Sequence, residues 1–229
     1  MVGSSDAQES RRSRRRPGFR FLLGGLIALL ILFPELEQVA RPLILVMPIA
    51  FVFVVGVMVA EGGRADDRRA WLIAAIQLGC TLMSLFVRDL DGPYYLIAVS
   101  SALLATVILM LFATNCILRY VLRARMISRD QICAGVCMYL MLGFAFGSIF
   151  YLLYVLNPNS FAESSPNSRP PDLMYFSFVT LATLGYGDII PRTNLARSVA
   201  VLEATAGMLY IAVFMARLVS MYSTSDERN

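Results

Sequence analysis

Six apolar segments, each close to the length of a membrane crossing, dominate this chain of 229 residues. A helix needs about 20 apolar residues to cross a bilayer. Hydrophobic residues make up 58% of the chain, too many for an ordinary soluble domain. The segments lie at about 19–33, 43–60, 70–87, 94–118, 132–156 and 196–222. The sequence therefore predicts an all-α membrane protein with six transmembrane helices.

The first of these segments is the shortest and has an alternative interpretation. A basic start followed by a short apolar run is also typical of a signal peptide. Such a peptide ends in small residues at its cleavage site, whereas Pro34-Glu35-Leu36-Glu37 follows this run. We therefore expect a retained span, with a cleaved signal peptide as the alternative.

The arginines indicate how the chain lies in the membrane. All 20 basic residues are Arg, a bias that we attribute to a GC-rich, bacterial genome. With the N-terminus inside, fifteen of them fall in cytoplasmic stretches, as the positive-inside rule requires. This predicts a multi-pass protein of the cell (inner) membrane with both termini cytoplasmic. The Arg-rich arm at 1–20 is expected to contact anionic lipids. The net charge of +4 does not indicate nucleic acid, because the arginines cluster beside apolar spans.

The sequence offers too few Cys and His ligands for a zinc site. The chain contains no His, so a His-based metal site is excluded. Its four cysteines lie within or beside apolar segments, where we expect them to act as small buried hydrophobic residues. They are Cys80, Cys116, Cys133 and Cys137.

A shorter apolar stretch lies between the fifth and sixth spans. Residues 157–172 are polar and rich in turn-forming residues, and we expect them to form an exposed turret. Pro170 and Pro171 precede Asp172, a candidate N-cap for a helix over Leu173–Ala182. Ten residues are too few to cross the bilayer. The pattern predicts a re-entrant helix that enters and leaves the membrane on the outer side.

The run Thr-Leu-Gly-Tyr-Gly-Asp at Thr183–Asp188 follows this short helix. Gly185 and Gly187 have access to backbone conformations that residues with a side chain avoid. Glycines that alternate with larger residues allow several carbonyls to point the same way, and a ring of such carbonyls replaces the water shell of a potassium ion. An ordinary turn is the alternative interpretation.

With these residues the chain resembles the tetrameric potassium channels, over about 132–222. The resemblance implies a homotetramer in which each chain supplies one quarter of a selectivity filter, with K+ as the permeant ion and no cofactor. It places K+ contacts at Thr183, Leu184, Gly185 and Tyr186, and includes Gly187 in the filter. The sequence then divides into a basic arm (1–20), four spans (21–131), a pore region (132–222) and a cytoplasmic tail (223–229).

The resemblance also assigns residues around the filter. Asp188 is expected at the outer mouth, where its charge raises the local cation concentration. Tyr186 is expected to pack on Tyr175 or Phe176 of the short helix, with Thr180 as a further support. Relatives of this family include some with a Glu that braces the filter against the outer Asp. Val179 stands at that position here, so this brace is absent.

The last span contains the candidates for a gate. Gly207 fits a hinge or close helix packing equally well. Met208, Ile211, Met215 and Val219 share one helix face, which lines a pore or packs elsewhere. Glu203 stands among apolar residues at membrane depth. We expect it to bond behind the filter, to the short helix or to a neighbouring subunit, and to bias gating by its protonation. The alternative for Glu203 is a structural carboxyl group bonded to a nearby hydroxyl such as that of Thr205.

The leading spans argue against a steeply voltage-gated channel. A voltage sensor needs several basic residues inside the fourth span, but 94–118 contains none, so steep voltage gating is not expected. Gly143 and Gly147 form a GxxxG pair that suggests close helix contact in the fifth span. The sequence therefore predicts a passive potassium channel and no enzyme. The alternatives are a weakly selective cation channel, a potassium transporter (which needs four such loops per chain) and a non-conducting membrane scaffold.

Overall fold

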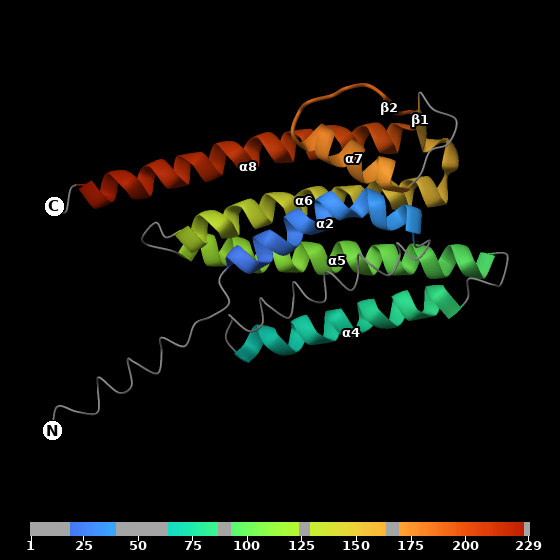
Figure 1. Ribbon diagram of the computed structural model, residues 1–229, viewed down its shortest axis with the longest axis horizontal. Helices are drawn as coiled ribbons and strands as arrows, with labels where there is room; N and C mark the ends of the chain where they lie inside the picture. Colours follow the sequence, from blue (N-terminus) through green and yellow to red (C-terminus); the bar gives the residue numbers. More distant parts are fainter. Residues whose placement is uncertain (1–18, 40–63, 87–92, 124–128, 164–169, 227–229) are drawn as a thin grey trace.

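The computed structural model describes residues 19–39, 64–86, 93–123, 129–163 and 170–226, which are mostly helical (Figure 1). The predicted span at 43–60 lies outside these residues, as do nearly all of the Arg-rich arm and the last three residues of the tail. The long helices are α2 (Phe19–Val39), α4 (Arg64–Phe86), α5 (Pro93–Arg123), α6 (Arg129–Leu156) and α8 (Asn194–Asp226). The prediction of a mainly helical membrane protein is confirmed.

Three stretches in the described residues are long and apolar enough to cross a membrane. They are Tyr94–Arg119 in α5, Arg129–Leu156 in α6 and Asn194–Ser220 in α8. The apolar stretches of α2 and α4 are shorter, at Phe19–Leu32 and Ala75–Ser84. Six crossings therefore remain a prediction.

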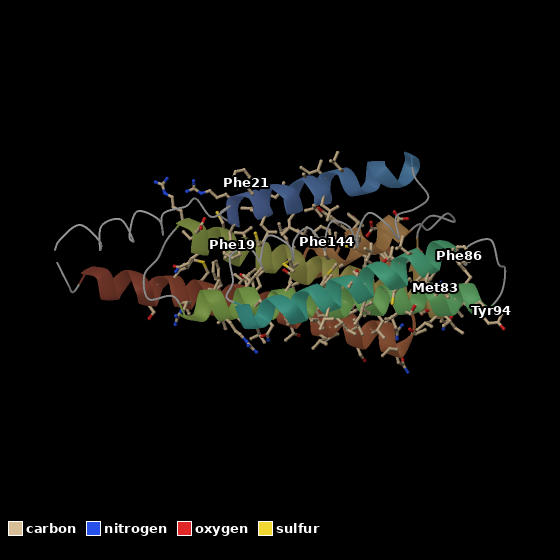
Figure 2. The ribbon with its side chains drawn as sticks, turned by 90° about the horizontal axis from the view of Figure 1, so that it is seen from below. Phe19, Phe21, Met83, Phe86, Tyr94 and Phe144 are labelled. Atoms are coloured by element: carbon tan, nitrogen blue, oxygen red, sulfur yellow. The ribbon has the colours of Figure 1, made fainter. Side chains whose placement is uncertain are left out.

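Helix α6 lies at the centre of the described helices (Figure 1). It packs against α2 and α5 on one side and against α7 (Pro170–Leu181) and α8 on the other, while α4 packs against α5. Fully buried Leu, Met and Phe side chains fill the space between α2, α5 and α6. In Figure 2, Phe144 lies between helices, whereas Phe21 projects from the outer side of α2 and is 74% exposed. Such an outward apolar face suits a helix in contact with lipid.

The short helix α7 begins at Pro170, which is earlier than the sequence suggested. Asp172 lies in its first turn, so the prediction of Asp172 as the N-cap is wrong. Proline is tolerated in a first helical turn because the N–H that it lacks has no helical partner there. The helix ends at Leu181, within one residue of the expected end.

A small two-stranded sheet ties together the chain on both sides of this helix. Strand β1 (Phe161–Glu163) follows the short 3-10 helix η1 (Pro158–Ser160) and pairs antiparallel with β2 (Ile189–Pro191). The backbone N–H of Arg192 adds a 2.8 Å hydrogen bond to the carbonyl of Ser160. Ser160 and Phe161 are buried, so the expected exposed turret is wrong for these two residues. The apolar ring of Phe161 explains this, because it packs on Phe150 and Phe176.

Candidate functional site

The glycine-rich run begins directly at the end of α7 and is hydrogen-bonded to it. The backbone N–H of Thr183 donates to the carbonyl of Thr180 at 3.0 Å. The carbonyl of Val179 accepts from the N–H of Leu184 at 2.9 Å and from that of Gly185 at 3.5 Å. The last turn of the short helix therefore fixes where the run starts and in which direction it leaves.

Every second residue of the run has a left-handed backbone. The φ angles are 57° at Thr183, 58° at Gly185 and 77° at Gly187. Glycine reaches this region without strain, whereas a residue with a side chain rarely adopts it. Thr183 is the one non-glycine residue of the described chain with positive φ. A backbone that alternates in this way allows successive peptide carbonyls to point toward the same side of the chain.

The run lies on an open face of the single chain. All residues from Thr183 to Gly187 are exposed. No atom lies within 4 Å of the position that a Cβ would occupy at Gly185 or Gly187, apart from their own chain neighbours. The need for glycine at these two positions therefore comes from the backbone angle, with no contribution from crowding in the single chain.

Tyr175 supports the outer end of the run in two ways. Its ring stacks on that of Tyr186, with centroids 6.4 Å apart and an interplanar angle of 9°. Its hydroxyl hydrogen-bonds to the carboxylate of Asp188. The pKa of Tyr175 is raised mainly by partial desolvation and to a smaller extent by this carboxylate, so the hydroxyl keeps its proton and stays a donor. Asp188 also accepts a 3.1 Å hydrogen bond from the N–H of Ile189. Val179 is buried.

Phe176 has a different place from Tyr175. Its ring contacts Phe150 at 5.0 Å and Phe161 at 5.7 Å between centroids, on the side of α7 that faces α6 and β1. Of the two aromatic partners that the sequence offered for Tyr186, the structure therefore places Tyr175 against it. Phe176 instead holds the short helix to its surroundings.

Glu203 of α8 is fully buried and reaches the short helix. Its Oε1 lies 2.5 Å from the hydroxyl of Ser177 in α7. The hydroxyl of Thr205 donates instead to the carbonyl of Val201 in its own helix, at 2.8 Å. The partner of this carboxyl group is therefore Ser177, which the sequence analysis did not single out.

Two further contacts fix the end of α7. The hydroxyl of Tyr139 in α6 donates to the carbonyl of Leu181 at 3.2 Å. A Cβ placed on Gly207 of α8 would lie 2.5 Å from the same carbonyl oxygen. Gly207 is therefore a point of close helix contact, which agrees with the packing interpretation. The sequence analysis named neither Tyr139 nor Ser177. A side chain with a hydroxyl group inside an otherwise apolar segment was the signal that could have indicated them.

The GxxxG pair of α6 receives side chains from α7. A Cβ on Gly143 would meet the ring of Phe178, and one on Gly147 would meet the sulfur of Met174. The GxxxG pair is therefore a point of close contact between α6 and the short helix α7. The hydroxyl of Ser177 adds a 2.7 Å contact with the carbonyl of Gly143.

The two faces of α8 have different surroundings. Glu203, Gly207 and Phe214 face α6 and α7. The apolar stripe that contains the other candidate gate residues is exposed in the single chain. Its residues are Met208, Ile211, Met215 and Val219. The stripe is thus free to face a pore, a neighbouring subunit or lipid.

Comparison with known proteins identifies the region that contains these features. The family model described as an ion channel matches residues 137–224. The chain is 39% identical over 66 residues to an inward rectifier potassium channel of Paramagnetospirillum magnetotacticum, covering 29% of this chain and 22% of the relative. It is 31% identical over 93 residues to a two-pore potassium channel of Oryza sativa, covering 40% of this chain and 20% of the relative.

A third relative is a regulatory subunit of voltage-gated potassium channels from Rattus norvegicus, 32% identical over 77 residues, or 33% of this chain and 15% of the relative. The chain thus spans less than a quarter of the length of these three relatives. No solved structure matches the chain significantly. The matched region contains the short helix, the left-handed run and most of α8. This part of the chain is therefore similar to ion channels and, among the relatives named above, to potassium channels.

Proposed function

We propose that four copies of this chain form a potassium-selective channel, with residues Thr183–Gly187 of each copy making one quarter of the filter. The observation that carries this proposal is the alternating left-handed backbone at Thr183, Gly185 and Gly187 on an open face. One copy presents a single row of carbonyls, whereas a cation that loses its water needs oxygens on all sides. A closed ring around an axis supplies them.

In this proposal the protein acts by coordination and electrostatics, without catalysis. Potassium ions leave water for the carbonyl oxygens and move by mutual repulsion between adjacent sites. The hydroxyl of Thr183 adds an oxygen at the inner end of the filter. The negative end of the α7 dipole favours a cation near the start of the run. Asp188 attracts cations to the outer mouth.

The arrangement in the membrane is part of the same proposal. We infer six crossings per subunit in the cell membrane, with the Arg-rich arm (1–20) and the tail (223–229) on the cytoplasmic side. The four leading spans (21–131) precede the pore region (132–222). The arm contacts anionic lipids. Voltage dependence is weak because the apolar stretch at 94–118 contains no basic residue.

The direct test is ion flux into liposomes that contain the purified full chain. We expect potassium uptake that greatly exceeds sodium uptake and that barium blocks, together with a fourfold mass for the assembly. Gly185→Ala is expected to abolish uptake, because alanine disfavours the left-handed angle. Gly25→Ala in α2 is the matched control, because an added Cβ meets no atom within 4 Å there and the angle is not left-handed. A different mass or equal sodium uptake would contradict the proposal.

Two alternatives predict other outcomes of this experiment. A weakly selective cation channel would pass sodium as well as potassium, although the retained Tyr186 argues against it. A non-conducting subunit is favoured by one observation, the relative that is named a regulatory subunit. Such a protein would give no uptake alone, but would change uptake through another potassium channel placed in the same liposomes.

A further inference from the structure

The polar contacts behind the filter form two layers across α6, α7 and α8. In the first layer Gly143, Ser177 and Glu203 meet. The second layer consists of Tyr139, Leu181 and Gly207. Each of these lies four positions along its helix from the corresponding residue of the first layer. Residues four apart lie above one another on a helix face. The three helices are therefore held in register over one full turn, and the second layer includes the last residue of α7.

The first layer depends on a single hydroxyl proton. Ser177 is fully buried, and its Oγ lies 2.7 Å from the carbonyl oxygen of Gly143 and 2.5 Å from Oε1 of Glu203. A serine hydroxyl donates one hydrogen bond and accepts others. A backbone carbonyl and an ionised carboxylate both only accept. Both contacts are hydrogen bonds together only when the carboxyl group of Glu203 carries a proton and donates it to Ser177.

The surroundings of Glu203 also disfavour a charge. Its second oxygen, Oε2, is buried and has no hydrogen-bond partner in the described residues. No arginine of the described chain forms an ion pair with it. The nearest arginine toward the outer end of α8, Arg197, donates to the carbonyl of Pro191. Tyr139 of α6 is the titratable group that interacts electrostatically with Glu203. An ionised carboxylate without a partner is far more costly to bury than a neutral acid.

We propose that Glu203 is a neutral acid whose proton completes a chain of hydrogen bonds from Glu203 to Ser177 to the Gly143 carbonyl, and that this chain positions the short helix from which the filter starts. This rests on the proposed function, because its consequence is measured as potassium conduction. Glu203 and Ser177 are positioning residues: they touch no ion and act through α7. These hydrogen bonds and the contact between Tyr139 and Leu181 link both membrane-spanning helices of the pore region to the base of the filter.

The first arm of the test reads the proton itself. The infrared difference spectrum between the wild-type chain and Glu203→Gln, both in liposomes, isolates the vibrations of this one carboxyl group. We expect a carbonyl stretch of a protonated acid, absent from the variant and shifted in heavy water. Carboxylate bands in its place would overturn the proposal. This arm needs no ion flux, so it stands or falls separately from the proposed function.

The second arm reads the positioning. In Glu203→Gln the amide N–H₂ replaces the acid as donor to Ser177, so we expect potassium uptake within about twofold of the wild type. Glu203→Leu and Ser177→Ala leave a buried polar partner unpaired, and we expect about tenfold lower uptake for each. Ser148→Ala is the control, because Ser148 is also buried but its hydroxyl bonds only to the carbonyl of Phe144 in its own helix.

The pattern of these variants decides the second arm. Rescue by Gln with loss in Leu supports a role as donor. Equal loss in Gln and Leu would overturn that role, and so would full uptake in Ser177→Ala. If Glu203→Leu fails to assemble, the comparison of Glu203→Gln with Ser177→Ala still decides. If the wild-type chain gives no uptake, the proposed function fails and the infrared arm still decides whether Glu203 is neutral.

Discussion

The glycines of the leading helices α2 and α4 and those of the pore-region helices α6 and α8 have opposite surroundings. At Gly24, Gly25 and Gly79, in α2 and α4, an added Cβ would meet no atom within 4 Å. In the pore region, a Cβ on Gly135 would collide with the ring of Phe214, and one on Gly207 with the Leu181 carbonyl. The same residue type therefore leaves open space in one region and permits close helix contact in the other.

This difference indicates which helices pack so closely that they leave no room for an added methyl group. Helices α6, α7 and α8 approach so closely that side chains and carbonyls occupy the space that a methyl group would need. Well-packed interiors adapt poorly to added volume. If the pore region determines the filter geometry, small changes there should alter conduction, and equal changes in α2 or α4 should not.

Among the variants that test this comparison, Gly207→Ala is expected to change potassium uptake and stability the most. The new methyl group would lie 2.5 Å from the Leu181 carbonyl oxygen and 2.9 Å from its Cδ1. Because the oxygen belongs to the backbone, it cannot rotate away, and we expect a loss of about 1–3 kcal/mol in stability. Potassium uptake should fall by more than that of any variant discussed below. Uptake and thermal unfolding of the purified assembly measure both effects.

Gly79→Ala is the matched control in α4. Its methyl group meets no neighbour, and alanine is a better helix former than glycine by about 1 kcal/mol. We expect unchanged uptake and equal or slightly higher stability. Normal uptake in Gly207→Ala, or a loss in Gly79→Ala, would remove the distinction between the two regions.

The sequence was sufficient to predict the left-handed backbone of the glycine-rich run, because this geometry is local. The left-handed angles at Gly185 and Gly187 follow from residues that need no distant partner, and α7 ends within one residue of its expected end. Long apolar stretches likewise revealed α5, α6 and α8 without knowledge of their packing. Local patterns were therefore enough to predict both the long helices and the backbone of the glycine-rich run.

The contacts that hold the short helix and the start of the glycine-rich run in place were not predictable in the same way. Ser177 contacts Gly143 across 34 positions, and Tyr139 contacts Leu181 across 42. Neither residue stands out in its own helix, because its role arises from how three helices align. The pairing of Phe161 with Pro191 was hidden for the same reason, inside a stretch rich in turn-forming residues.

A smaller effect is expected from Tyr175→Phe. Phenylalanine keeps the ring that stacks on Tyr186 but loses the hydroxyl that bonds to Asp188. Solvent reaches this half-exposed site and weakens the interaction between the hydroxyl and the carboxylate, so its loss should have only a moderate effect. We expect uptake to fall several-fold and the preference for potassium over sodium to weaken. Sodium and potassium uptake measured side by side test this.

The control for this change is Tyr94→Phe at the start of α5. Tyr94 is 70% exposed and lies at the end of the leading helices (Figure 2). Loss of its hydroxyl should leave both fluxes unchanged. If Tyr175→Phe also leaves them unchanged, Asp188 does not depend on this tyrosine, and the outer end of the filter is held by the β1–β2 pair and the aromatic rings.

The smallest effect is expected from a buried polar group outside the pore region. Gln77 in α4 is fully buried; its Nε2 donates to the hydroxyl of Thr106 in α5 at 2.6 Å, and its Oε1 has no partner in the described residues. Thr106 also donates to the carbonyl of Ala102 at 2.9 Å, so it keeps a partner when the amide is removed. Gln77→Met therefore removes this hydrogen bond and two longer ones of 3.4 Å, to the hydroxyl of Thr81 and the carbonyl of Ala102, together with one unpartnered oxygen. These contributions oppose each other, and we expect a change in stability within about 1 kcal/mol.

Potassium uptake should be unchanged in Gln77→Met, because no contact of Gln77 reaches α7 or the filter. Thermal unfolding and uptake of this variant, measured beside Gly207→Ala, place the two regions on one scale. A large loss of uptake in Gln77→Met with an intact assembly would mean that the contact between α4 and α5 controls the pore. The leading helices would then belong to the gating apparatus, and close packing around α7 would explain only part of the conduction.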